Sequence, residues 1–220
     1  MIDEIVPAGV AAAECFGDVP EATLYPRERA ALGRVGEPRL LEFATVRHCA
    51  RDALRKLGLP PAPLVPGERG APQWPAGVVG SMTHCAGYRA AVVTHRSGIR
   101  TLGIDAEPHE PLMEGLLRHI ALPEERERHI ELAGRYPDVH WDRLLFCAKE
   151  AVYKAWFPVT RRWLSFHDAQ VSPRPDGTFR ARILAERPPG QPSPPEAFEG
   201  RWLARDGLLL ACATDPRPLC

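Results

Sequence analysis

The chain has 220 residues, of which 45% are hydrophobic, and its basic and acidic residues balance to a formal net charge of zero. This length suits one sizeable globular domain or two small fused lobes. The neutral balance argues against a broad nucleic-acid-binding surface. No apolar run approaches the roughly 20 residues of a membrane span, and the acidic start lacks the order of a signal peptide. We therefore expect a cytoplasmic protein that binds neither nucleic acid nor a membrane.

The cysteines are scattered along the chain and contain no Cys-x-x-Cys pair. Such spacing favours reduced thiols over a disulfide framework or a structural zinc site. The six positions are Cys15, Cys49, Cys85, Cys147, Cys212 and Cys220.

A helix is predicted over residues 39–57, where apolar residues recur with an approximate 3.6-residue period. Before it, residues 10–15 are compatible with either a strand or a short helix. Arg47, Arg51 and Arg55 lie four residues apart on the predicted helix and form one basic ridge. Such a ridge is either a solvated helix face or a clamp for phosphate, whose oxygens match the guanidinium fork.

Two further candidate ligand contacts follow this helix. Residues 59–77 form a proline-rich loop in which Arg69 either presents a charge to a ligand or occupies a surface turn. Residues 78–83 and 88–93 flank a short turn and predict a β-hairpin. His84 lies at the end of the first of these strands, so we expect it near the turn.

The next strand, predicted over residues 101–107, carries two acids near its end. Side chains alternate along a strand, so Asp105 and Glu107 project from one face. Adjacent carboxylates repel each other unless a cation or a proton lies between them. The pair is therefore either an exposed strand end with solvated acids or one side of a cation site. Pro108 cannot donate to a ladder and ends the strand.

Residues 110–135 have a helical pattern with a second start at Pro123. Proline suits the first helical position, and acids suit the positive end of the helix dipole. Glu124 and Glu125 are therefore explained most simply as capping residues.

A second long helix is predicted over residues 141–157, and it is apolar around most of its circumference. Lys149, Glu150 and Lys154 interrupt it within one arc of about 140° at 100° per residue. Charge inside an apolar helix costs several kcal/mol unless it is paired or bound to a metal. A Glu150–Lys154 pair would leave Lys149 without a partner, so we interpret the excess charge as functional.

The remaining sequence predicts strands and one loop. Each half then contains a helix followed by antiparallel strands, which predicts an α+β fold of two similar lobes related by a pseudo-twofold axis. We place the lobes at residues 1–108 and 109–220, with the active site between them. The strands are predicted over residues 166–171, 178–184, 200–204 and 208–213, and the loop over residues 188–195.

Three carboxylates without cysteine or histidine partners favour a hard cation, and we expect Mg²⁺, with Mn²⁺ as a possible substitute. The chemistry implied is attack at a phosphorus centre, with the cation drawing off developing negative charge. The chain lacks a Walker-type glycine loop, which argues against an ordinary P-loop ATP site. The predicted ligands are Asp105, Glu107 and Glu150.

Two stretches in this order resemble a known family. Gly103-Ile104-Asp105-Ala106-Glu107 is followed about forty residues later by Phe146-Cys147-Ala148-Lys149-Glu150-Ala151-Val152-Tyr153-Lys154. This pair resembles the signature of the 4′-phosphopantetheinyl transferases. The length and the strand end Ser81-Met82-Thr83-His84 are similar to the monomeric Sfp-type branch, close to its actinobacterial members.

The resemblance implies transfer of the 4′-phosphopantetheine arm of coenzyme A to a serine of an apo acyl or peptidyl carrier protein, which is holo-acyl-carrier-protein synthase activity. The other product is adenosine 3′,5′-bisphosphate. It also implies that Glu150 and Lys154 are catalytic, and Glu124 lies near a family glutamate proposed to take the serine proton. The positions it assigns to coenzyme A are Arg47, Arg55, Arg69, Ser81, Thr83, His84, Lys149 and Lys154.

Two other functions stay open on the residues alone. The same three acids would serve a metal-dependent phosphodiesterase or pyrophosphatase that acts on coenzyme A-like nucleotides with water as the nucleophile. The basic residues alone would serve a non-catalytic coenzyme A-binding protein. We also predict that residues 157–163, which are both apolar and basic, form part of the carrier dock. Fatty-acid, polyketide and nonribosomal-peptide carriers all fit this expectation.

Overall fold

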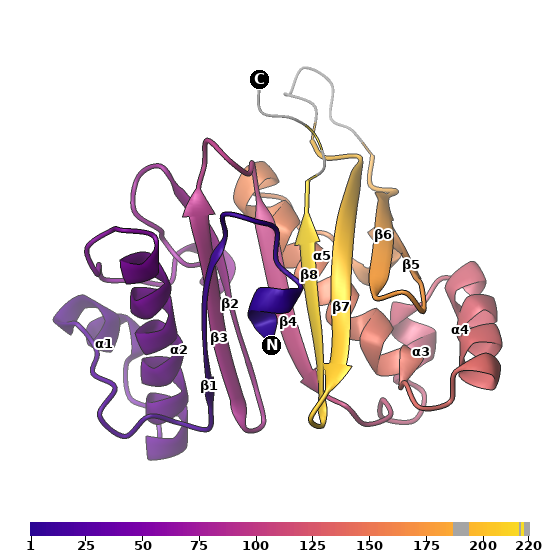
Figure 1. The fold of residues 1–220 in the computed structure, drawn as a ribbon, viewed down its shortest axis with the longest axis horizontal. Coiled ribbons are helices and arrows are strands. Elements are labelled where there is room, and N and C mark those ends of the chain that lie inside the picture. The colour runs from indigo at the N-terminus through magenta and orange to yellow at the C-terminus, as the bar shows by residue number, and fades with distance from the viewer. Residues whose placement is uncertain (187–193, 216, 218–220) are drawn as a thin grey trace.

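The computed structural model describes residues 1–186, 194–215 and 217. Cys220 and positions 188–193 of the predicted loop lie outside these described residues. Two antiparallel sheets with helices packed against them form the fold, so the predicted α+β class is confirmed (Figure 1). Among the described residues, no helix is both long enough and apolar enough to cross a membrane.

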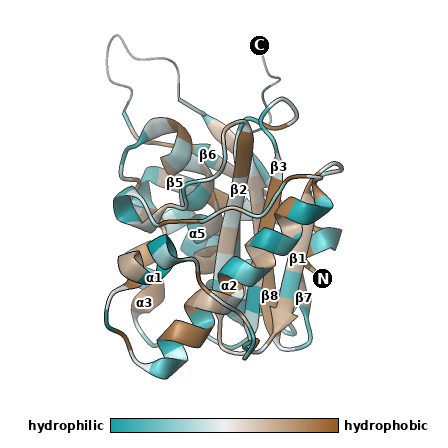
Figure 2. Cartoon of the chain, turned by 90° about the vertical axis from the view of Figure 1, so that its left-hand side faces the viewer, coloured by the Kyte–Doolittle hydropathy of each residue, from teal (hydrophilic) through white to brown (hydrophobic). Residues whose placement is uncertain are grey.

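The first sheet has three strands in the order β1-β3-β2, and the predicted hairpin forms its β2–β3 part. Buried side chains of α2 pack against the sheet, and Figure 2 shows hydrophilic residues on the outward side of this helix. Residues 11–15 of the stretch 10–15 belong to strand β1, which settles the alternative left open by their pattern. The elements are η1 (Ile2–Glu4), β1 (Ala11–Phe16), α1 (Pro26–Leu32), α2 (Glu37–Lys56), η2 (Glu68–Gly70), β2 (Val78–Cys85) and β3 (Tyr88–His95).

The second sheet has five strands in the order β4-β8-β7-β6-β5. The helical pattern over residues 110–135 is realised as two helices, and residues 110–115 are not helical. The elements are β4 (Leu102–Pro108), α3 (Leu116–Ile120), α4 (Pro123–Arg135), α5 (Trp141–Thr160), η3 (Phe166–Asp168), β5 (Ala169–Pro173), β6 (Thr178–Ile183), β7 (Ala197–Arg205) and β8 (Leu208–Thr214).

Strand β4 lies at the junction of the two sheets (Figure 1). The sequence pattern groups it with the preceding hairpin, but its backbone ladder is with β8, where Asp105 pairs with Ala211. Toward β2 the hydrogen bonds come from side chains instead. The hydroxyl of Ser81 accepts from the amide of Ile104 at 3.0 Å, and that of Thr83 accepts from the amide of Ala106 at 3.1 Å. The lobe division at residue 108 and the pseudo-twofold relation stay predictions.

Helix α5 packs directly on β4, and a glycine makes this close approach possible. A Cβ atom at Gly103 would overlap the carbonyl oxygen of Ala151 and lie 2.5 Å from the amide nitrogen of Ala155. The hydroxyl of Thr101 donates to the carbonyl of Ala155 at 2.6 Å. This packing holds the acids of β4 beside the charged residues of α5.

Candidate active site

Asp105 is buried at the junction of the sheets and is only 5% exposed. Its Oδ1 atom accepts hydrogen bonds from Lys154 Nζ at 2.7 Å and from Thr83 Oγ1 at 3.1 Å. Its Oδ2 atom is also buried and has no hydrogen-bond partner among the described residues. A buried carboxylate oxygen without a partner is costly. This oxygen is therefore a candidate ligand position.

Lys154 extends from α5 to β4 and contacts Asp105, not Glu150. It also donates to the hydroxyl of Thr83 at 3.3 Å. The alternative considered from the sequence, a Glu150–Lys154 pair along the helix, is therefore not the pairing that the described residues adopt. Helical spacing brings Glu150 and Lys154 within reach of each other. The carboxylate of Asp105, on β4, is more deeply buried than that of Glu150, and it pairs with the ammonium of Lys154.

Glu107 accepts a hydrogen bond from Arg143 at 2.9 Å, and this arginine also donates to two backbone carbonyls of the segment after β4. Burial raises the pKa of Glu107, the charge of Asp105 adds to the rise, and Arg143 opposes it. Sequence reasoning missed Arg143. A signal was present, because Arg143 lies seven residues before Glu150, two turns away on the same side of α5.

Glu150 lies on α5 and is partly buried. Burial raises the pKa of its carboxyl, and the charges of Asp105 and Glu107 raise it further against the opposition of Lys154. The three predicted acids therefore act on one another electrostatically. Their combined negative charge exceeds what Lys154 and Arg143 neutralise.

Among the described residues, no group of three or more histidine, cysteine, aspartate or glutamate side chains is arranged as a ready metal site. The donor chemistry nevertheless fits a hard divalent cation. All three candidate ligands are carboxylates, Asp105 Oδ2 is buried without a partner, and two of the acids have raised pKa values. The match to a divalent cation therefore rests on the carboxylate donors and on their uncompensated negative charge.

A cavity of about 430 Å³ opens beside these acids. Residues from α2, β2, the loop around η2 and α5 line it, so it lies between the elements of the first sheet and the long helix of the second. The described residues on its wall include five side chains with guanidinium or ammonium groups and one carboxylate, that of Glu150. The cationic and histidine residues are Arg39, Arg47, Arg69, His84, Lys154 and Arg161. Such a wall suits an anionic ligand.

The three arginines of the predicted ridge have three different environments. Arg47 lines the cavity, donates to the carbonyl of Leu64 at 3.0 Å, and lies over the ring of Phe43. Burial lowers its pKa to about 10, so it stays charged near neutrality. Arg51 is buried against Glu28, at 3.2 Å, and does not line the cavity. Arg55 is exposed and pairs with Asp52.

Glu28 organises this region from behind the cavity. It is fully buried, it lies 4.0 Å from Arg47, and its carboxylate also accepts from Arg51 and from the amide of Leu64 at 2.8 Å. Sequence reasoning did not select Glu28, because a glutamate in a short helix is usually solvated. The burial of Arg47 and Arg51, which the structure shows, explains its position, since buried cations need a carboxylate.

His84 lies at the cavity wall beside Arg39, with 3.1 Å between Nε2 and the guanidinium, and 3.4 Å from Glu42. Burial lowers the pKa of His84, while Glu42 opposes the shift. Arg39 was not among the predicted residues, although it begins the predicted helix.

Arg69 reaches the same cavity from a left-handed backbone position, with φ of 53°, and its guanidinium lies over the ring of Trp163.

Lys149 does not line the cavity of about 430 Å³ and instead contacts α4, η3 and the start of β5. Its ammonium pairs with Glu125 at 2.8 Å and donates to the carbonyls of Phe166 at 2.6 Å and Ala169 at 2.9 Å. The inference that Lys149 lacks a protein partner is therefore wrong.

The capping prediction for Glu125 is confirmed, since its carboxylate accepts a hydrogen bond from the amide of Leu122 at 2.7 Å. Glu124 is exposed in the first turn of α4.

A second, smaller cavity of about 130 Å³ adjoins the first. Glu150 and Tyr153 line both cavities, and Trp163 and Phe166 contribute aromatic surface to the smaller one. The hydroxyl of Tyr153 is buried and has no hydrogen-bond partner. An elongated ligand with an anionic end and a less polar end would fit the two spaces together.

Two family models match the chain. The 4′-phosphopantetheinyl transferase N-terminal domain matches residues 27–94, and the 4′-phosphopantetheinyl transferase superfamily matches residues 101–198. The two matches cover both sides of the cavity. The protein belongs to the 4′-phosphopantetheinyl transferase superfamily, as the paired motifs predicted.

Named relatives cover nearly the whole chain. It is 50% identical to 4′-phosphopantetheinyl transferase Svp of Streptomyces mobaraensis, across 99% of this chain and 90% of the relative. It is 47% identical to PptT of Mycobacterium tuberculosis, across 96% of both chains. It is also 47% identical to Npt of Nocardia iowensis, across 96% of this chain and 97% of the relative. The predicted actinobacterial Sfp-type branch is therefore confirmed.

Proposed function

We propose that this enzyme transfers the 4′-phosphopantetheine arm of coenzyme A to a serine of an apo acyl or peptidyl carrier protein, with Mg²⁺ as the cofactor and adenosine 3′,5′-bisphosphate as the second product. The observation that carries the proposal is one cavity with a cationic wall that also contains Glu150, whose carboxylate is coupled electrostatically to Asp105 and Glu107. Family membership supplies the reaction class. The cavity supports the choice of a large polyanionic substrate.

The cationic wall divides into two groups. Arg39, Arg47 and His84 come from α2 and β2 and would balance the phosphate on the nucleotide. Lys154 is close to Asp105 and would face the phosphate that is attacked. Guanidinium groups bind phosphate oxygens through two parallel hydrogen bonds. Because the wall residues on α2 and β2 are separate from Lys154, the wall supports a ligand that carries phosphate groups at more than one place.

Asp105, Glu107 and Glu150 would hold the Mg²⁺, because all are oxygen donors and Asp105 Oδ2 is unpartnered. When bound, the cation would stabilise negative charge that develops on the phosphate oxygens. Arg143 would keep Glu107 oriented through its hydrogen bond. Lys154 would release part of its contact with Asp105 and bind the leaving phosphate oxygen through its ammonium.

The serine nucleophile belongs to the partner, so this chain has to position it and accept its proton. Glu124, which the family resemblance suggests as the acceptor, is exposed on α4 and borders neither of the two cavities of the site. Its role stays a prediction, and the Glu124→Gln variant tests it. A proton acceptor requires that the group be within hydrogen-bond reach of the serine hydroxyl.

The carrier dock is proposed at residues 157–163. Trp163 is 60% exposed, and Arg162 precedes it. Arg161 lines the cavity, so a change there would disturb both substrates. An Arg162→Glu variant should therefore raise the KM for an acidic carrier and leave the KM for coenzyme A unchanged. If the wild type and the Arg162→Glu variant had equal KM values for the carrier, this result would contradict a dock at residues 157–163.

The direct test of the reaction class is product analysis with coenzyme A and Mg²⁺, in the presence and absence of an apo carrier. We expect adenosine 3′,5′-bisphosphate to appear only when the carrier is present. Release of this nucleotide without a carrier would support a phosphodiesterase or pyrophosphatase instead. Binding of coenzyme A without any release, with several carriers, would support a non-catalytic binding protein.

A further inference from the structure

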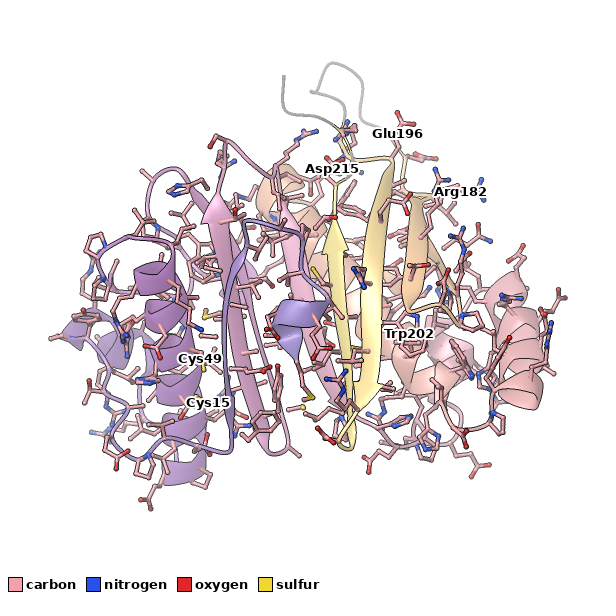
Figure 3. The ribbon with its side chains drawn as sticks, viewed as in Figure 1. Cys15, Cys49, Arg182, Glu196, Trp202 and Asp215 are labelled. Carbon is pink, nitrogen blue, oxygen red and sulfur yellow. The ribbon has the colours of Figure 1, made fainter. Side chains whose placement is uncertain are left out.

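Two thiols meet between β1 and α2, away from the proposed active site. Cys15 lies on β1 and Cys49 on α2, and their sulfur atoms are 3.5 Å apart. Figure 3 labels both residues at this interface. In the part of the chain that the structure describes, this is the one hydrogen-bond contact between two sulfur atoms.

The two sulfurs differ in accessibility. Cys49 is fully buried in the core between α2 and the first sheet, while Cys15 is partly exposed on the edge strand. The cross-strand partner of Cys15 is Arg89, and the thiol of Cys49 lies 3.8 Å from the carbonyl of Arg89. The backbone ladder and the helix packing therefore hold both thiols in place. An oxidant in solvent can reach Cys15 first.

We propose that Cys15 and Cys49 form a modification site, an oxidisable dithiol that closes to an intrachain disulfide when the protein meets a hydroperoxide. A disulfide has an S–S length of about 2.05 Å. The sulfurs must therefore approach each other by about 1.5 Å, a movement within the range of side-chain rotation and a small helix shift.

The reaction has two balanced steps. The thiolate sulfur of Cys15 attacks the terminal oxygen of the hydroperoxide, the O–O bond breaks, the alkoxide or hydroxide leaves and takes a proton, and Cys15 becomes a sulfenic acid. The sulfur of Cys49 then attacks the sulfur of Cys15, the S–O bond breaks, and the hydroxide leaves with the thiol proton as water. The two sulfurs together supply two electrons to the peroxide.

The disulfide would join β1 to the helix that carries part of the substrate wall. Cys49 lies two residues after Arg47 on α2, and Arg39 is on the same helix. The bond would also close a chain segment that contains α1 and the buried Glu28. Oxidation would thus brace the region behind the cationic wall without consuming a residue of the site.

To test this proposal, the protein is treated with hydrogen peroxide and the reaction is quenched. The protein is then denatured, and its remaining thiols are alkylated before non-reducing peptide mapping. We expect two fewer alkylated cysteines and one cross-linked peptide that joins Cys15 to Cys49, both reversed by dithiothreitol. Cys15→Ala and Cys49→Ala should each abolish this cross-link. Cys85→Ser is the matched control, because Cys85 is partly exposed and should leave the cross-link intact.

Two results would overturn the proposal. One is a cross-linked peptide that joins other cysteines and persists in the Cys15→Ala variant. The other is full alkylation of Cys15 and Cys49 at a peroxide dose that already oxidises Cys85. If Cys49→Ala lowers the yield of folded protein, Cys15→Ala carries the test, because Cys15 is the less buried of the two.

Discussion

Lys149 and Glu125 form an ion pair of 2.8 Å, and each side chain is about 2% exposed. The pair joins α5 to the start of α4, and Glu125 also accepts from the amide of Val171 on β5 at 2.6 Å. Lys149 is the neighbour of Glu150 in the sequence. The pair therefore anchors the turn of α5 that presents Glu150, from the side away from the cationic wall.

Loss of one partner of this pair should destabilise the fold. Lys149→Met would leave the carboxylate of Glu125 buried without its cation, and we expect the free energy of unfolding to fall by about 3–5 kcal/mol in urea titrations. Arg128→Ala is the control, because its pair with Glu131 is exposed and should change stability by at most about 1 kcal/mol. If Lys149→Met had wild-type stability and a raised KM for coenzyme A, Lys149 would be a substrate contact.

Removal of the charge on Glu150 should slow the reaction strongly and spare the fold. Glutamine keeps the shape of this partly buried side chain but is a weaker cation ligand. We expect Glu150→Gln to lower kcat/KM on the order of 10²–10³-fold, the range for loss of one group that stabilises developing charge. Glu131→Gln, on the exposed side of α4, should have wild-type activity. A drop of less than twofold in Glu150→Gln would contradict the proposed site.

Binding of the nucleotide should take up a proton at His84. Burial lowers the pKa of His84 and so favours the neutral imidazole, whereas a bound phosphate would favour its charged form. We expect the affinity for adenosine 3′,5′-bisphosphate to rise as pH falls from 8 toward 6. The phosphate itself has a second pKa of about 6, so calorimetry must compare the wild type with His84→Gln. Equal proton uptake in both proteins would show that His84 does not contact the phosphate.

Substitution of Gly103 tests the contact between β4 and α5. Alanine at this position would force its Cβ into the backbone of α5, and overpacking of this kind costs about 1–3 kcal/mol or more. We expect a lower midpoint in urea for Gly103→Ala. Gly134→Ala is the matched control, since a Cβ there meets nothing within 4 Å, and alanine in a helix should be neutral or stabilising by up to about 1 kcal/mol. A stable Gly103→Ala protein would mean that α5 can move away from β4.

The local pattern was sufficient to predict most helices and strands, because apolar periodicity reflects which face is buried. It was not sufficient for the position of β4. Residues 102–106 are all buried, on both faces of the strand, so alternation carried no information about its partner. Its pairing with β8 joins residues about a hundred positions apart, and no local signal encodes that choice.

The site shows the same division between local and long-range information. Asp105 and Glu107 were selected because neighbouring carboxylates repel each other, and Glu150 and Lys154 because charge in an apolar helix is costly. The direction of Lys149 was not predictable from its helical angle, since its partner comes from a capping position on another helix. Arg39 was identified only when the structure placed α2 at the cavity, and the helical spacing between Arg143 and Glu150 gained its meaning from the contact of Arg143 with Glu107.

The central claim is tested most directly by the intact mass of an apo acyl carrier protein incubated with this enzyme, coenzyme A and Mg²⁺. We predict a mass gain of one phosphopantetheinyl group, its loss when EDTA removes the Mg²⁺, and a gain slowed on the order of 10²–10³-fold with Glu150→Gln. An unchanged mass for both acyl and peptidyl carriers, with a folded enzyme that binds coenzyme A, would contradict the account.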